Sequence, residues 1–170
     1  SIIEQRGKQS QLLKMDVLML GTKDDLSTKM KKLFDQITEI IDIFKPDILA
    51  IEAPFFGKNV QSMLKLGRAQ GICIAAAFSR SIPFVEYSPR KVKQSITGNG
   101  AASKEQVANM LQRMFNFESI PSYLDATDAL AVAVCHSYQK EDLLVSNSSV
   151  KKTSSKKSSW ASFVSQNPDR

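Results

Sequence analysis

Ile48-Leu49-Ala50-Ile51-Glu52-Ala53 is the stretch that decides the fold class of this 170-residue chain. Its apolar residues follow one another without the polar alternation of a half-exposed strand, a pattern that is typical of strands covered on both faces. An acid beside such residues is costly to bury, so Glu52 is expected at the exposed carboxyl end of the strand. Because open α/β sheets bind ligands at that end, the stretch predicts an α/β domain with a functional carboxylate at Glu52.

Two aspartates open a predicted helix in Asp125-Ala-Thr-Asp128-Ala-Leu-Ala. Positions three apart share one face of a helix, and a strand-end carboxylate can meet them across the edge of a sheet. Carboxylates are ligands that Mg²⁺ takes, and clustered acids repel one another unless a cation lies between them. We therefore predict a metal site made by Glu52, Asp125 and Asp128 that acts on a phosphate. For the two aspartates alone, capping of the helix N-terminus explains the pattern equally well.

Hydrophobic periodicity and the Gly, Pro and capping signals predict a hairpin followed by alternating helices and strands. The predicted elements are, in chain order, strands over 1–5 and 12–20, a helix over 26–44, a strand over 48–53, a helix over 60–79, a strand over 84–87, and helices beginning at 89, 104 and 125. Ser103 and Gln106 have the spacing of a capping box, which places Lys104 in the first turn of its helix. The helix dipole disfavours a cation there, so we expect a bound phosphate near Lys104.

Positive charge is concentrated in the middle of the chain. The formal net charge is +6, and residues 58–104 carry eight Lys and Arg side chains against one acid. A basic segment between acid-bearing segments suits an enzyme that grips a polyanion with one surface and holds a metal ion with another. A solvated charged face without a ligand would produce the same distribution.

Composition predicts one globular domain followed by a tail. With 42% hydrophobic residues the chain can bury a core, which we assign to residues 1–145. Residues 146–170 are rich in Ser and Lys and are predicted to form a flexible basic tail, in which Trp160, Phe163 and Val164 have the spacing of a short docking helix. No apolar run is long enough to span a membrane and no signal-peptide pattern is present, so we expect a cytoplasmic protein.

Several motifs occur together in an order that resembles the RuvC family of crossover junction endodeoxyribonucleases. They are the strand ending at Glu52, the turn Phe55-Phe56-Gly57-Lys58-Asn59, the run Leu64-Lys65-Leu66-Gly67-Arg68-Ala69-Gln70-Gly71, Val92-Lys93-Gln94, and Asp125-Ala-Thr-Asp128-Ala-Leu-Ala. The resemblance covers residues 1 to about 140, and the motifs are specific in combination. It implies an RNase H-like fold, in which a mixed five-stranded sheet is flanked by helices on both faces.

The resemblance also implies an activity. Members of the family are homodimers that resolve four-way (Holliday) DNA junctions by paired symmetric nicks in recombination and DNA repair, with two Mg²⁺ ions per active site and Mn²⁺ as a substitute. The branch-migration complex is an expected partner. By position, Glu52, Asp125 and Asp128 match catalytic metal ligands. The DNA-binding residues that the resemblance implies are Phe55, which would stack into the opened junction unless it belongs to the core, and the basic residues Lys93, Lys104, Lys58 and Arg68.

One part of the family pattern is missing. The fourth acid of the family lies on a first, central strand in a Gly-x-Asp-Pro-Gly motif, and this motif does not occur in the chain. We therefore expect that the chain is truncated at its N-terminus, lacks that strand and is inactive as it stands. Two alternatives to a junction endonuclease stay open: a catalytically incomplete junction-binding domain, and an RNase H-like nuclease that acts on RNA.

Overall fold

The computed structural model describes residues 1–7, 9–54, 59–121 and 123–147, with side chains described as far as Gln139. The chain divides into two compact units, Ser1–Lys140 and Glu141–Arg170. The elements below belong to the first unit, except that the last helix continues as far as Asn147. Within the described ranges, no helix is both long and apolar enough to cross a membrane. The predicted tail lies almost entirely outside the described residues, so the predicted boundary at 145 stays a prediction.

The chain begins with the predicted hairpin. β1 (Ile2–Arg6) pairs antiparallel with β2 (Gln9–Lys14), and Gly7 lies in the turn with a φ of 59°, which glycine adopts without strain. The predicted bounds of 12–20 for the second strand are wrong, because β1 offers partners only as far as Lys14. Just beyond, the N–H of Val17 donates to the Asp16 carboxylate at 2.8 Å.

Two parallel strands carry the segment that was expected to decide the fold. β3 (Leu49–Glu52) pairs with β4 (Phe84–Tyr87), and the register sets Glu52 opposite Tyr87. The N–H of Ala53 then donates to the Tyr87 carbonyl at 2.8 Å and extends the pairing by one bond. Because the strands are parallel, both carboxyl ends lie at the same edge, which is where Glu52 is presented.

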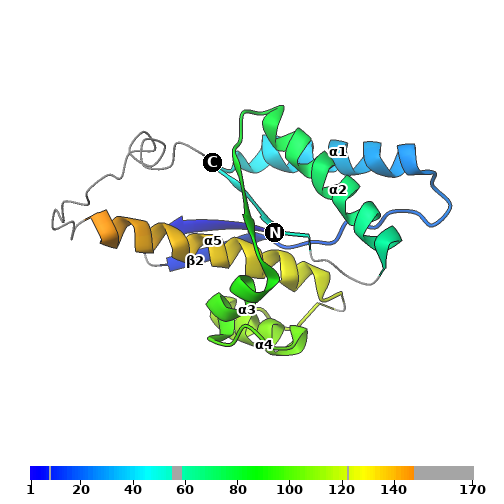
Figure 1. Cartoon of the computed structure of the whole chain (residues 1–170). Helices are drawn as coiled ribbons and strands as arrows, with labels where there is room; N and C mark the ends of the chain where they lie inside the picture. Colours follow the sequence, from blue (N-terminus) through cyan, green and yellow to red (C-terminus); the bar gives the residue numbers. More distant parts are fainter. Residues whose placement is uncertain (8, 55–58, 122, 148–170) are drawn as a thin grey trace, which may run out of the picture. The chain divides into compact units, whose positions relative to one another are not determined.

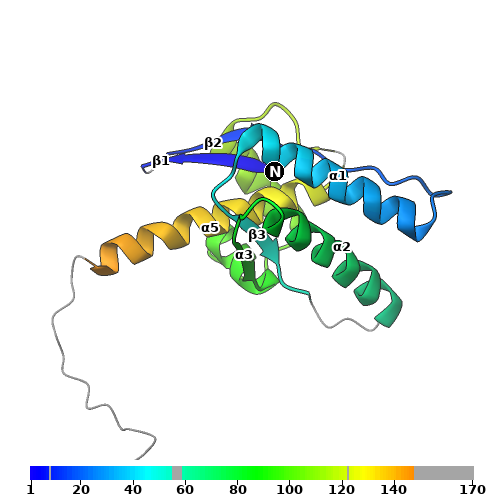
Figure 2. The same ribbon diagram turned by 90° about the horizontal axis from the view of Figure 1, so that it is seen from above.

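Helices cover both faces of this strand pair, as predicted. α1 (Leu26–Phe44) and α2 (Val60–Phe78) pack side by side and form a small core cluster against Leu49 (Figure 2). On the other face, Ala50 and Val85 pack on the main core, to which α3 (Pro89–Thr97), α4 (Lys104–Phe115) and α5 (Asp125–Asn147) contribute (Figure 1). Successive residues of a strand point to opposite faces, so Leu49 and Ala50 join different layers.

Capping groups set the helix boundaries close to the predicted ones. α1 begins after Asp25, whose carboxylate accepts a hydrogen bond from the Thr28 N–H at 2.7 Å. Ser103 and Gln106 form the predicted capping box at the start of α4, and α3 ends at Gly98 with a φ of 73°. These ends place the first turns of α4 and α5 within contact distance of each other, because Lys104 of α4 reaches Asp125 and Asp128 of α5.

The α/β class is confirmed, whereas the arrangement of the whole sheet is not. In the described part of the chain the strands form two pairs, β1–β2 and β3–β4. The hairpin is tied to the rest of the unit through Ile3 and Leu12, which pack against the main core. The single five-stranded sheet implied by the family resemblance stays a prediction.

Candidate active site

Glu52 is the last residue of β3, and its side chain is exposed at the carboxyl end of the strand, as predicted. Two hydrogen bonds hold the backbone around it. Its carbonyl oxygen accepts from Gln70 Nε2 of α2 at 2.6 Å, and the N–H of the next residue, Ala53, donates to the Tyr87 carbonyl of β4. The carboxylate is therefore presented from a strand end that both the neighbouring strand and α2 hold in place.

Asp125 and Asp128 lie in the first turn of α5, which begins at Asp125 as predicted. The side chain of Asp125 is 79% exposed and that of Asp128 is 31% exposed. Among the described residues, no backbone N–H donates to either carboxylate, and the first-turn position of both acids is one that the helix dipole also favours. Their contacts are instead with the side chain of Lys104.

Lys104 joins the two aspartates. Its Nζ lies 3.6 Å from Asp125 Oδ1 and donates a hydrogen bond to Asp128 Oδ2. This hydrogen bond is the main reason that the pKa of Lys104 is raised, and the charges of both aspartates add to it. In this structure the partners of the cation in the first turn of α4 are carboxylates of a neighbouring helix, and the expected phosphate near Lys104 stays a prediction.

Glu52 is electrostatically linked to the same group. Partial burial raises the pKa of its carboxyl group, and the negative charge of Asp128 raises it further. The positive charges of Lys104 and Lys93 act in the opposite direction. Residues from β3, α3, α4 and α5 thus form one electrostatically linked cluster, and the grouping of Glu52, Asp125 and Asp128 around one metal ion stays a prediction.

The donors of this cluster suit a divalent cation. No group of three His, Cys, Asp or Glu side chains close enough to hold one metal ion is found among the described residues. The positive charge beside the aspartates comes from the Lys104 ammonium, which contacts both of them. Carboxylate oxygens are hard donors of the kind that Mg²⁺ takes, and a cation would relieve the repulsion from Asp128, which adds to burial in raising the pKa of Glu52. The chemistry of the residues therefore fits the predicted metal.

The other predicted site residues are distributed as follows. Lys93 of α3 lies near enough to influence Glu52, and Arg68 is exposed on α2. Phe55 and Lys58 lie outside the described residues.

Gln70 is a residue of the site that sequence reasoning missed. It lies in the run Leu64–Gly71 that carries the family resemblance, but nothing in that run indicates its contact with Glu52. Gln70 contacts a backbone carbonyl. Every residue has such a carbonyl, so the residue type at position 52 does not indicate this contact. Only the packing of α2 against the end of β3 reveals it.

Comparison with known proteins gives a consistent result. A family model described as "Crossover junction endodeoxyribonuclease RuvC" matches residues 1–136, a range that contains all the acids and lysines of the cluster. A relative with the same description from Cytophaga hutchinsonii is 52% identical over 169 residues, covering 99% of this chain and 80% of the relative. One from Porphyromonas gingivalis is 51% identical over 166 residues, covering 96% of this chain and 85% of the relative.

Solved structures resemble the fold as well. "T. thermophilus RuvC in complex with Holliday junction substrate" aligns with a TM-score of 0.77 at 28% identity, covering 82% of this chain and 86% of that chain. "Thermus thermophilus RuvC structure" aligns with a TM-score of 0.73 at 28% identity, covering 83% of this chain and 86% of that chain.

Proposed function

Because the chain belongs to the crossover junction endodeoxyribonuclease RuvC family and has its RNase H-like α/β fold, we propose that the full-length protein resolves four-way DNA junctions by paired symmetric nicks. One observation carries the proposal: Lys104 of α4 contacts both acids of α5, and the charges of Asp128, Lys104 and Lys93 act on Glu52 at the end of β3. Such a cluster combines a place for a cation with a place for phosphate, which phosphodiester hydrolysis requires.

We propose Glu52, Asp125 and Asp128 as the catalytic metal ligands. When bound there, two Mg²⁺ ions, or Mn²⁺ as a substitute, would supply an activated water and charge stabilisation at the leaving oxygen. The protein's contribution is to hold Glu52 at a strand end anchored by Gln70 and to hold the two aspartates on one helix turn. Lys104, released from the aspartates, becomes available to a phosphate oxygen.

The basic residues are proposed as DNA contacts. Lys93 and Lys104 lie beside the acids and would hold phosphate close to the bond that is cut. Arg68, exposed on α2, and Lys58, which precedes α2 in the sequence, would contact the DNA backbone further away. Phe55 is proposed to stack into the opened junction, as apolar side chains do when they wedge into a base step.

An exposed stripe on α2 supports the proposed homodimer. The residues of this stripe are spaced three, four or seven apart along α2, so they share one face of the helix. They are Val60, Leu64, Gly67, Gly71 and Phe78. Val60, Leu64 and Phe78 are exposed by 62%, 51% and 59%. A Cβ atom at Gly67 or Gly71 would meet nothing within 4 Å, so the backbone there is open to close approach. A two-fold dimer through this stripe presents two equivalent sites to a junction with two-fold symmetry.

Further features of the proposal come from the resemblance and the composition of the chain. We propose that the complete site has a fourth acid in a five-stranded sheet. The basic tail, 146–170, is proposed to tether the cytoplasmic enzyme to DNA and to the branch-migration complex, with Trp160, Phe163 and Val164 as its docking face.

The proposed function is tested with a panel of substrates. The full-length protein is incubated with a synthetic four-way junction, linear duplex DNA and an RNA–DNA hybrid, each with Mg²⁺ and with EDTA. We expect Mg²⁺-dependent nicks in the junction at symmetric positions, and little cleavage of the other two. Junction binding without any nicking would identify a catalytically incomplete binding domain, and preferential cleavage of the hybrid would identify a nuclease that acts on RNA.

A further inference from the structure

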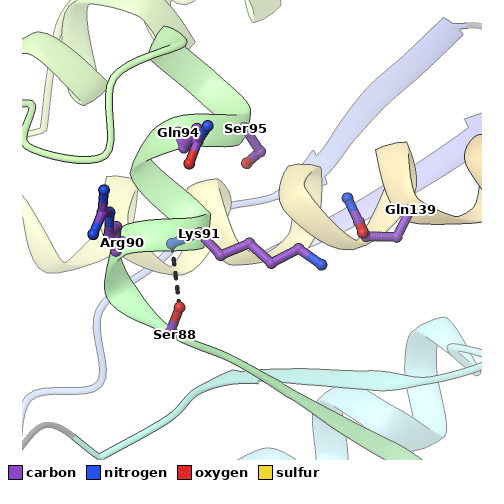
Figure 3. Close-up of a pocket in the computed structure, with 6 residues that line it drawn as sticks. All are labelled: Ser88, Arg90, Lys91, Gln94, Ser95 and Gln139. Atoms are coloured by element: carbon purple, nitrogen blue, oxygen red, sulfur yellow. Dashed lines mark hydrogen bonds between the residues drawn. The ribbon is translucent and has the colours of Figure 1, made fainter.

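A shallow hollow of about 500 Å³ lies between α3 and α5. Figure 3 shows its lining side chains, with Lys91 of α3 reaching toward Gln139 of α5. The lining residues are all polar, two of them are cationic and none is acidic: Ser88, Arg90, Lys91, Gln94, Ser95 and Gln139. A hollow of this composition is suited to an anion.

The two cations of the hollow lack acidic partners. In the part of the chain that the structure describes, ion pairs involve other basic residues, and none involves Arg90 or Lys91. The Lys91 ammonium lies 5.5 Å from the centroid of the Tyr87 ring, and the Tyr87 hydroxyl is hydrogen-bonded to His136 Nδ1 at 2.8 Å. A cation–π contact orients the ammonium but does not neutralise its charge.

The stem of Arg90 is held against the turn that follows α3. A Cβ atom at Gly100 would lie 2.6 Å from Arg90 Cγ and 3.1 Å from the Arg90 carbonyl oxygen, so the turn can approach this closely only because residue 100 is glycine. Side chains that are restrained before a ligand arrives lose less entropy when it binds. Arg90 and Lys91 are both exposed, each has one contact that restricts its side chain, and among the described residues neither charge is compensated by an acid.

We propose that this hollow binds a backbone phosphate of a DNA arm adjacent to the strand being cut, an inference that rests on the proposed function. The guanidinium of Arg90 and the ammonium of Lys91 supply the charge, and the amides of Gln94 and Gln139 supply neutral donors. Lys91 and Lys93 are two residues apart and therefore point about 160° away from each other around α3. The hollow and the acidic cluster thus lie on different sides of this helix. The hollow therefore contributes to DNA affinity and leaves the chemical step unchanged.

Salt dependence of DNA binding tests the inference. The variant Arg90→Gln/Lys91→Gln keeps a polar side chain at each position and removes two charges. Lys23→Gln/Arg113→Gln, which removes two charges from exposed positions before α1 and on α4, is the matched control. Binding to a synthetic four-way junction is measured in EDTA, so that it does not depend on cleavage. We expect the hollow variant to bind about tenfold more weakly and to reduce the slope of log K against log salt by about one, while the control changes neither.

Two further measurements complete the test. Gln139→Ala, which removes a neutral donor on the other helix, should weaken binding without changing the salt slope, and the rate of nicking at saturating enzyme should be unaltered in both hollow variants. An unchanged salt slope in Arg90→Gln/Lys91→Gln would overturn the inference, and so would an equal loss of DNA affinity in the control variant. Normal junction binding by Arg90→Gln/Lys91→Gln together with slow nicking would also overturn it. If Arg90→Gln prevents folding, Lys91→Gln alone must show the same change of slope. Failure of the wild-type protein to nick junctions would refute the proposed function and leave the binding result to stand by itself.

Discussion

Replacing Lys104 with glutamine should destabilise the metal-free protein and should matter less when a divalent cation is bound. The Lys104 ammonium lies 3.6 Å from Asp125 Oδ1 and is hydrogen-bonded to Asp128. Two unit charges at that separation attract each other by about 1 kcal/mol in a water-like dielectric. Because the Lys104 side chain is 52% exposed, screening and side-chain entropy reduce each pair to about 0.2–1 kcal/mol. We expect the two pairs together to contribute about 1 kcal/mol to the free energy of unfolding, which corresponds to a decrease of about 2–4 °C in Tm.

The pKa of Lys104 determines the pH at which this effect is visible. It is raised in the folded protein, mainly by the hydrogen bond to Asp128. The stabilising contribution is therefore complete below the pKa of lysine in the unfolded chain and is lost as the pH rises through the higher pKa of the folded state. Measurements at neutral pH capture all of it, and the difference between wild type and Lys104→Gln should disappear in strong alkali.

Thermal unfolding of four proteins measures the coupling. Wild type, Lys104→Gln, Asp128→Asn and the double variant are melted in EDTA and in excess Mg²⁺, with Lys23→Gln as a control for the loss of one exposed charge. In EDTA we expect a coupling free energy of about 0.5–1 kcal/mol between positions 104 and 128. In Mg²⁺ the coupling should decrease, because the ion takes over the neutralisation of the aspartates. Equal destabilisation in both solutions would refute the view that Lys104 occupies the position of a cation.

The remaining predictions concern activity, assembly and the tail. Glu52→Gln should abolish nicking and preserve junction binding, and normal nicking by this variant would contradict the assignment. Because burial raises the pKa of Glu52, this substitution should also stabilise the metal-free fold at neutral pH. The gain in stability should vanish as the pH falls below the normal range of glutamate. Phe55→Ala should reduce junction cleavage with an unchanged Tm, since a lost stacking contact costs about 1–3 kcal/mol per base, whereas a sharp fall in Tm would assign Phe55 to the core. Leu64→Glu on the exposed stripe of α2 should convert the dimer to a monomer in analytical ultracentrifugation, and an unchanged sedimentation coefficient would place the interface elsewhere. Deletion of 146–170 should leave cleavage at low salt unchanged and weaken DNA binding as salt increases. Trp160→Ala should reduce only association with a partner, and loss of cleavage in this variant would place the tail in the catalytic fold.

Features that depend on neighbours in the chain were predictable from the sequence alone. Ser103 and Gln106 form a capping box because both groups lie within one turn, and α5 begins at Asp125 because its apolar pattern begins there. The exposed position of Glu52 followed from the cost of burying an acid beside an apolar strand. The order of the elements and the exposed strand-end position of Glu52 therefore required no structure.

Contacts between distant segments were decided only by the tertiary structure. The second strand of the hairpin ends at Lys14 because β1 supplies no partner beyond it, although the sequence continues to favour a strand. Lys104 binds aspartates more than twenty residues away, and Gln70 holds a backbone carbonyl, which no side-chain pattern reveals. Hydrogen bonds and ion pairs act over a few ångströms, so their partners are set by how the helices pack on the sheet. Local sequence thus determined which groups are available, and packing determined which of them meet.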